Sequence, residues 1–323
     1  MSYPIEFLHQ YQLNSDKTGQ ALQRSTAATP VDGTTLWQHV DLKHTTTKPW
    51  LRYAAGIDAT VFQSLSADET RPRSLVTPTG LMIVLRGVNH NPGEDPEDMV
   101  SIRLWIEKDR VLSARIRALL SIQDIVDSIN DQQGPRSSGE FLTRLIELLA
   151  NRIGDFVNRI EDEVSETEEA LEMMGPSEMR AKLGSLRRQI ASVRRFLAPQ
   201  RDALDRLYHE ETEVLQDRDR HRLREESDRI SRYLEDLDLA RERAIVLQEA
   251  FLSQLAQQQN NRMYVLSIVA AIFLPLTFVT GLLGMNVGGL PLLDNDQGFV
   301  IASIVMLTAT VVLTIFFKLK DWF

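Results

Sequence analysis

Two long apolar runs lie close together in the C-terminal part of a chain that is otherwise rich in charge. Residues 264–283 form a run of 20 residues without a charged side chain, and residues 299–317 form a second run of 19. As a helix, each run would be about 30 Å long, which matches the hydrocarbon core of a bilayer. Two buried core helices are the alternative, but two adjacent runs of this length favour the membrane. The pattern therefore predicts transmembrane helices over residues 263–283 and 299–317.

Short β-rich runs dominate the first part of the chain and predict a mixed α/β domain over residues 1–135. Strands are expected over residues 35–40, 80–88, 99–106 and 110–116. Helices are expected over residues 50–55, 59–65 and 119–129. A Gly-, Pro- and Ser-containing stretch at residues 132–139 is typical of a linker.

From Glu140 onward the chain is highly charged and its apolar residues recur at helical spacing. Two heptad patterns predict packed helices. The members of the first are Leu186, Ile190, Val193, Leu197, Leu204, Leu207 and Val214, and those of the second are Leu223, Ile230, Leu237, Ala244 and Phe251, with Leu234 and Leu255 offset. Ser177 is expected to cap the second helix, Pro199 to kink it, and residues 217–222 to reverse the chain.

No Gly or Pro occurs between residues 200 and 274, so the last polar helix can continue into the first span without a break. The expected organisation is an α+β cytoplasmic domain followed by a long helical stalk and two C-terminal transmembrane helices. Its expected segments are a cytoplasmic α/β domain (1–135), a helical hairpin region (136–216), a stalk helix (217–262), a first span (263–283), an external loop (284–298), a second span (299–317) and a cytoplasmic tail (318–323).

The distribution of charge predicts the orientation of the spans. The connecting loop carries Asp294 and Asp296 but no basic residue. The basic residues lie at the other ends of the two runs, with Arg262 before the first and Lys318 and Lys320 after the second. The positive-inside rule therefore places both termini in the cytoplasm and the loop outside. The chain has no cysteine, which excludes disulfides and thiolate metal sites, and its net charge of −9 disfavours nucleic acid as a partner.

One face of the first span is small or weakly polar, as a pore lining would be. Its members are Met263, Ser267, Ala270, Leu274, Thr277 and Gly281. Two helices cannot enclose a water-filled path, so transport would require an oligomer. Close helix packing is the alternative reason for small residues on this face.

The turn after this span, Gly284-Met285-Asn286, is expected to form the mouth of such a pore. The side-chain carbonyl of Asn286 can orient the hydration shell of an ion without holding it tightly. Asp294 and Asp296, repeated by symmetry, would form rings of carboxylates that attract divalent cations.

Other candidate chemistry is weaker. His209 and Glu213, four residues apart on an expected helix, form a candidate cation site, although an ordinary i,i+4 pair is the better interpretation. Glu163 and Glu166 within an acidic run form another, although a solvated helix face is the better interpretation there. His39 and Asp41 are more readily explained as a structural pair. The sequence contains no P-loop, GxGxxG or nucleophile elbow, so no enzyme activity is predicted. The segment Arg71-Pro72-Arg73 is too short a basic patch to indicate nucleic-acid binding.

Gly284-Met285-Asn286, at the outer end of the first of two C-terminal spans, resembles the signature of the CorA superfamily of divalent-cation transporters. The extension Val287-Gly288-Gly289-Leu290-Pro291 is similar to the ZntB branch. Four further segments are similar to it as well: Arg71-Pro72-Arg73, Leu85-Arg86-Gly87-Val88-Asn89, Asn91-Pro92-Gly93, and residues 96–105. The similarity covers essentially the whole chain.

The resemblance implies a homopentameric funnel in lipid of the bacterial inner membrane, with Zn²⁺ as the transported ion and no covalently bound cofactor. It allows Co²⁺, Ni²⁺, Cd²⁺ or Mg²⁺ as further substrates and protons as the coupling ion. ZntB-like proteins have been assigned both efflux and proton-coupled uptake. Proton-coupled uptake is preferred, with zinc efflux or a CorA-type magnesium/cobalt channel as alternatives. A non-transporting, membrane-anchored coiled-coil scaffold is the hypothesis from another functional class.

Overall fold

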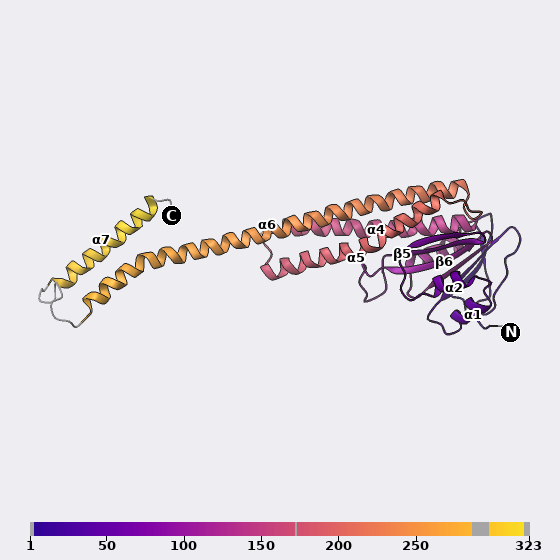
Figure 1. Cartoon of the computed structure of the whole chain (residues 1–323), viewed down its shortest axis with the longest axis horizontal. Helices are drawn as coiled ribbons and strands as arrows, with labels where there is room; N and C mark the ends of the chain where they lie inside the picture. Colours follow the sequence, from indigo (N-terminus) through magenta and orange to yellow (C-terminus); the bar gives the residue numbers. More distant parts are fainter. Residues whose placement is uncertain (1–2, 172, 286–296, 320–323) are drawn as a thin grey trace. The chain divides into compact units, whose positions relative to one another are not determined.

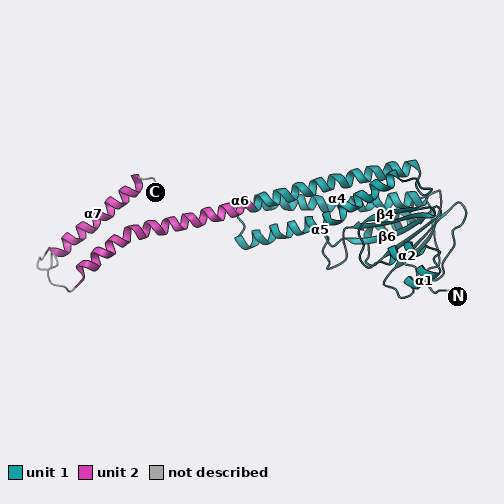
Figure 2. Ribbon diagram, in the orientation of Figure 1, with its two compact units in different colours: residues 1–248 teal, residues 249–323 magenta. Residues whose placement is uncertain are grey.

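The computed structural model describes residues 3–171, 173–285 and 297–319. It divides into two compact units, residues 1–248 and residues 249–323 (Figure 2). Helix α6 (Asp217–Leu283) begins in unit 1 and ends in unit 2 as one helix. The predicted continuity from the polar helix into the first span is therefore confirmed.

A seven-stranded mixed sheet forms the centre of unit 1 (Figure 1). Its strands, which lie in the spatial order β2-β1-β3-β7-β6-β5-β4, are β1 (His9–Leu13), β2 (Gly19–Ala21), β3 (Thr35–Asp41), β4 (Arg73–Thr77), β5 (Gly80–Gly87), β6 (Val100–Glu107) and β7 (Arg110–Arg115). Only β3 and β7 pair in parallel among these strands. The inner strands β5 and β6 are buried along nearly their whole length, which explains their continuous apolar runs.

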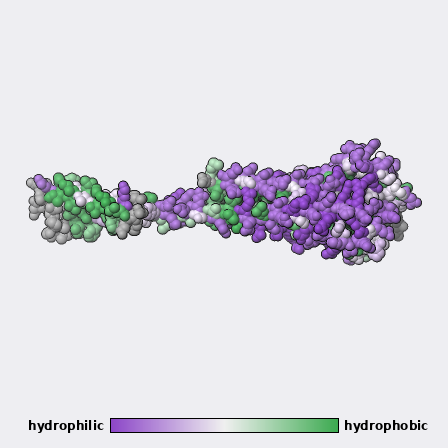
Figure 3. All heavy atoms as spheres, turned by 90° about the horizontal axis from the view of Figure 1, so that it is seen from above, coloured by the Kyte–Doolittle hydropathy of each residue, from purple (hydrophilic) through white to green (hydrophobic). Residues whose placement is uncertain are grey.

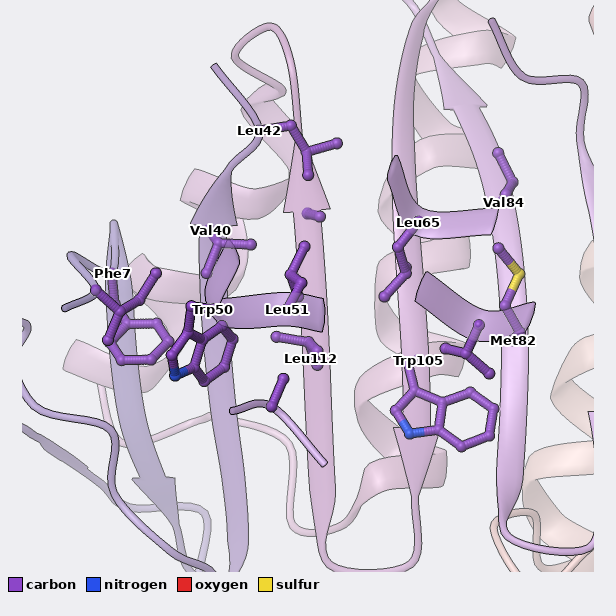
Figure 4. Packing of buried hydrophobic residues seen from close by; sticks show 14 residues of the cluster. Phe7, Val40, Leu42, Trp50, Leu51, Leu65, Met82, Val84, Trp105 and Leu112 are labelled. Carbon is purple, nitrogen blue, oxygen red and sulfur yellow. The ribbon is translucent and has the colours of Figure 1, made fainter. Parts of the chain in front are cut away.

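Helices α1 (Thr47–Tyr53) and α2 (Ala59–Ser66) cover one face of this sheet. Their apolar residues meet those of the strands in a common core (Figure 4). Trp50 of α1 packs edge-to-face on Phe7, with ring centroids 5.2 Å apart, and Leu65 of α2 lies in the same cluster as Trp105 of β6. This core explains why the short helices form at all, since helices of this length are marginal in isolation.

The opposite face of the sheet packs against longer helices, namely α3 (Leu120–Asn130), α4 (Ser138–Glu169) and α5 (Pro176–His209). Trp37 of β3 lies against Phe141 of α4, with ring centroids 5.0 Å apart. A Cβ at Gly87 would lie 2.6 Å from Leu149 Cδ2, so any side chain at the end of β5 would have to displace the Leu149 side chain of α4.

The heptad positions expected from the sequence form the interface of the helices in unit 1. The buried members within unit 1 include Leu186, Ile190, Val193, Leu197, Leu204, Leu207, Leu223, Ile230, Leu237 and Ala244. Gly154 of α4 lies opposite Tyr233 of α6 in this interface: a Cβ at Gly154 would be 2.5 Å from the tyrosine Oη.

Several local predictions were wrong. Strands β1, β2 and β4 were not predicted. In β1 and β2 the reason is their polar side chains, whose partners come from distant loops. Gln10 of β1, for example, donates to Thr26 O at 3.0 Å and to Gln23 O. Gly175, rather than Ser177, stands at the N-cap of α5, with Pro176 as its first residue. Pro199 lies inside α5, which continues past it to His209 with Leu197 and Leu204 buried on either side, and the expected kink at Pro199 stays a prediction.

The chain also reverses earlier than expected. Residues 210–216 connect α5 to α6, and residues 217–222, where the reversal was predicted, form the first turns of α6. Asp217 and Asp219 in the first turn of α6 favour a helix start there, because acidic side chains interact well with the positive end of the helix dipole.

Unit 2 contains the end of α6 and helix α7 (Gly298–Leu319). Within the described part of the chain, α6 and α7 are the two helices long and apolar enough to cross a membrane. Their surface in unit 2 is largely hydrophobic, whereas that of unit 1 is largely hydrophilic (Figure 3). Among the described residues of the two apolar runs, Ile268 of α6 and Phe317 of α7 are the buried ones.

Candidate ion pathway

The predicted pore-lining face of α6 is exposed along its whole length in the single chain. Met263 is 60% exposed and Leu274 is 72% exposed, and the four residues Ser267, Ala270, Thr277 and Gly281 are also exposed. The partly or fully buried residues of this segment lie on a different face, and they are Ile268, Ala271, Ile272, Leu276, Val279 and Leu283. The small, weakly polar face is therefore left uncovered by the rest of the described chain.

The hydroxyl groups on this face bond within their own helix. Ser267 Oγ donates to Met263 O at 2.8 Å, and Thr277 Oγ1 donates to Phe273 O at 2.8 Å. Such bonds satisfy the hydroxyl hydrogen and leave lone pairs on the oxygen as acceptors for water or a hydrated cation. Ser267 also lines an apolar cavity of about 260 Å³ together with Ile268, Ala271 and Phe317, so it lies at the border of the predicted face.

Pro275 interrupts the backbone hydrogen bonds of α6 in the middle of the apolar run. Because proline has no N–H, the carbonyl of Ala271 loses its helical partner. Thr277 and Thr280 lie nearby in sequence, but their hydroxyls donate to Phe273 O and Thr277 O respectively. The carbonyl of Ala271 is thus a polar group in the apolar run that neither threonine satisfies.

The predicted pore mouth follows directly on the last turn of α6. Gly284 N donates to Thr280 O at 2.9 Å, which completes that turn, and Met285 is exposed. Asn286, Asp294 and Asp296 lie outside the described residues. The structure thus brings Gly284 and Met285 to the end of the helix that carries the predicted lining.

The candidate cation residues of unit 1 do not form one site. Helix α5 ends at His209, so Glu213 lies in the following loop and the expected i,i+4 pair on one helix is wrong. Glu163 forms an ion pair with Lys182, with Oε2 and Nζ 2.6 Å apart. Lys182 precedes His209 by 27 residues of the same helix, which is about 40 Å. Glu166 is exposed on α4, and no cluster of three metal-binding side chains occurs among residues 3–171, 173–285 and 297–319.

His39 is a structural residue, but its partner is Ser113 and not the expected Asp41, whose Oδ1 accepts from Lys43 N. It is fully buried in β3, and its Nδ1 lies 2.8 Å from Ser113 Oγ of β7. Its ring stacks on that of His9 at a centroid distance of 5.8 Å. Burial, together with the positive charge of Arg115, lowers the pKa of His39 well below its ordinary value, so the ring is neutral at physiological pH.

The family model described as CorA-like Mg²⁺ transporter protein matches residues 32–320 of this chain. The chain belongs to the CorA family. Among curated CorA-like relatives, the divalent cation transporter CmaX of Pseudomonas aeruginosa is 37% identical over 273 residues, which cover 84% of this chain and 82% of CmaX. The zinc transport protein ZntB of Yersinia enterocolitica is 34% identical over 285 residues, which cover 88% of this chain and 86% of ZntB.

The solved structure of the full-length CmaX protein has a TM-score of 0.86 to this chain at 34% identity, covering 100% of this chain and 99% of CmaX. CorA-family membership confirms the resemblance drawn from Gly284-Met285-Asn286 and the flanking motifs. It also confirms the fold expected from the sequence, an α+β domain with a long helix and two C-terminal apolar helices.

Proposed function

We propose that this protein is a divalent-cation transporter of the bacterial inner membrane whose preferred substrate is Zn²⁺. The observation that carries the proposal is the family relationship over nearly the whole chain, including both apolar helices. Zinc as the substrate is supported by the similarity to ZntB. The proposed role is transport rather than enzyme catalysis.

The proposed pathway is built by a homopentamer, in which the exposed, weakly polar face of α6 turns toward the axis. Exposure of this face in one chain supports the assignment, because a face that borders water or another subunit has no partner within its own chain. The bulky exposed residues on the remaining surface, such as Phe273 and Phe278, suit contact with lipid. The proposed lining comprises Met263, Ser267, Ala270, Leu274, Thr277 and Gly281.

In the proposed mechanism, the cation enters with most of its hydration shell. Gly284, Met285 and Asn286 form the selectivity mouth, and Asp294 and Asp296 raise the local concentration of divalent cations outside. The lining offers hydroxyl and carbonyl oxygens, which are hard ligands, and the chain has no cysteine. Weak, hydrated contacts of this kind let the ion leave as easily as it enters.

Uptake driven by a proton gradient, with both termini in the cytoplasm, is the direction proposed here. Zinc flux into proteoliposomes, measured with and without a pH gradient, tests both substrate and coupling. The proposal requires zinc flux that increases when the gradient directs protons inward. Absence of zinc flux under any gradient would refute it. Efflux would appear as zinc movement only out of loaded vesicles.

Asn286→Ala tests the proposed mouth. Loss of the amide should reduce zinc flux by about tenfold or more, which corresponds to about 1.4 kcal/mol, while the oligomer stays intact on size-exclusion chromatography. Asn158→Ala is the matched control, because Asn158 is an exposed asparagine on α4, far from the apolar runs in sequence. Equal flux through the Asn286→Ala and Asn158→Ala proteins would remove Asn286 from the mouth.

A magnesium/cobalt channel is the second candidate, and the CorA-like Mg²⁺ transporter description of the matching family favours it. Magnesium uptake that excess zinc does not reduce would select this candidate. A protein without flux of any divalent cation would instead be a membrane-anchored scaffold.

A further inference from the structure

Unit 1 contains a polar cavity that plays no part in the proposed ion pathway. Its volume is about 380 Å³, and it lies between the segment before β4, the end of β5, the segment before β6 and helix α5. Its lining residues are Glu69, Thr70, Arg71, Arg86, Asp98, Arg195 and Phe196. Three of these seven are arginines, contributed by three segments that are distant in sequence.

Arg86 is held in a defined position at the centre of this arginine group. Its backbone N–H donates to Gln200 Oε1 of α5 at 2.7 Å, because β4 is too short to pair with the end of β5. Its Nη1 donates to Met99 O at 2.6 Å and its Nη2 to Thr70 O at 2.7 Å. The guanidinium carbon also lies 4.5 Å from the centroid of the Phe196 ring. These contacts fix the guanidinium without neutralising its charge.

The three arginines of the cavity exceed its two acidic residues, Glu69 and Asp98, both of which attract Arg86. Within the described ranges, Arg71, Arg86 and Arg195 have no carboxylate oxygen within 4.0 Å. Asp98 is engaged by Arg117 at 2.6 Å, and Glu69 is exposed. A further guanidinium, that of the fully buried Arg103, lies close enough to repel that of Arg86. Burial and this repulsion lower the pKa of Arg103 to about 10.

Two polar groups at the cavity also lack partners. Thr70 is 7% exposed, and its Oγ1 is buried without a hydrogen bond among the described residues. The Nε of Arg86 is likewise buried without an acceptor in the described part of the chain. Both atoms are inaccessible to solvent in this structure, so they lie behind the surface of the cavity and leave the recognition of a bound anion to the arginines.

We propose that this cavity binds a small phosphate-type oxyanion through Arg71, Arg86 and Arg195. Guanidinium groups recognise phosphate oxygens with two parallel N–H donors, and a tetrahedral anion can accept from three directions at once. The anion neutralises charge that the carbonyls around Arg86 leave uncompensated. The source of the phosphate group is inorganic phosphate or a phosphorylated metabolite, and both present the same chemistry.

Isothermal titration of the full-length protein in detergent with inorganic phosphate tests this site, with ionic strength held constant by chloride. Saturable binding of one phosphate per chain is expected. Arg195→Gln and Arg71→Gln should each raise the Kd at least tenfold, because each removes a charge-assisted contact. Both side chains are exposed and are not needed for folding of the cavity walls. Arg188→Gln, an exposed arginine elsewhere on α5, is the matched control and should leave the Kd unchanged.

Absence of saturable phosphate binding, or equal weakening by Arg188→Gln, would overturn the proposal. Glycerol 3-phosphate titrated in parallel distinguishes the sources: tighter binding than inorganic phosphate identifies a phosphorylated metabolite, and weaker binding identifies the free ion. This binding measurement is independent of cation flux, so its outcome does not depend on whether the protein transports zinc.

Discussion

Gly154 of α4 is predicted to be required for the close approach of α4 and α6 in unit 1. A Cβ at this position would lie 2.5 Å from Oη and 2.9 Å from Cζ of Tyr233. The tyrosine hydroxyl is held by Arg229, whose Nη2 donates to it at 3.0 Å. Gly154→Ala must therefore displace the tyrosine ring and break this hydrogen bond.

The magnitude follows from two opposing effects. Replacing glycine by alanine inside a helix stabilises it by about 0.5–1 kcal/mol, because the unfolded chain loses conformational freedom. Overpacking of an interface costs about 1–3 kcal/mol. We expect Gly154→Ala to destabilise unit 1 by about 1–2 kcal/mol, which lowers the Tm by about 2–8 °C for a domain of this size.

Gly184→Ala on α5 is the matched control, since a Cβ there would approach only Arg188 Nη1, at 3.5 Å. Gly184→Ala gains the same helix propensity without a steric overlap between the new Cβ and a neighbouring side chain. It should therefore raise the Tm by about 1–4 °C. Intrinsic tryptophan fluorescence during heating of the full-length protein in detergent reports on unit 1, because Trp37, Trp50 and Trp105 all lie there.

A second pair of variants isolates the contact itself. In a Tyr233→Ala background the ring is absent, so Gly154→Ala should become neutral or stabilising, as in a double-mutant cycle. If Gly154→Ala lowers the Tm equally with and without Tyr233, or behaves like Gly184→Ala in the wild-type background, the close approach of the two helices at this point is refuted.

Two further predictions concern the stability of unit 1. Ser137→Ala removes the side chain that accepts from Glu140 N at 3.2 Å at the start of α4, and it should cost about 1 kcal/mol, seen as a Tm lower by about 2–4 °C; an unchanged Tm would contradict the cap. The pKa of His39 is lowered mainly by burial and to a smaller extent by the nearby Arg115 and His9. The pKa of His9 is also lowered, mainly by burial and then by Arg24 and Arg115. Because the unfolded state then takes up these protons first, near its ordinary pKa of about 6.5, the Tm should fall as the pH is lowered from 7 to 5. His39→Asn should flatten this dependence, and a slope as steep as that of the wild type would exclude His39 as its cause.

The features that depend on local pattern could be predicted from the order of residues alone. The two uncharged runs identified α7 and the end of α6, and the lack of Gly and Pro after residue 200 predicted the long α6, because continuous helical hydrogen bonding needs only compatible residues along one segment. The heptad residues identified the buried side of α5 and α6 for the same reason. Apolar strands such as β5 and β6 were also recognisable, since strands buried on both faces are apolar along their length.

The contacts between residues distant in sequence became known from the three-dimensional fold. Strand β1 is held by hydrogen bonds between Gln10 and residues 23, 26 and 38, and the residue pattern within β1 does not predict these partners. The turn after His209 separates Glu213 from the helix that was expected to carry both. Arg71 could be recognised in the sequence as part of a basic motif. Its grouping with Arg86 and Arg195 arises where β5 extends beyond the end of β4 and Gln200 of α5 bonds to the backbone of β5. Contacts of this kind depend on chain topology, which local patterns in the sequence do not encode.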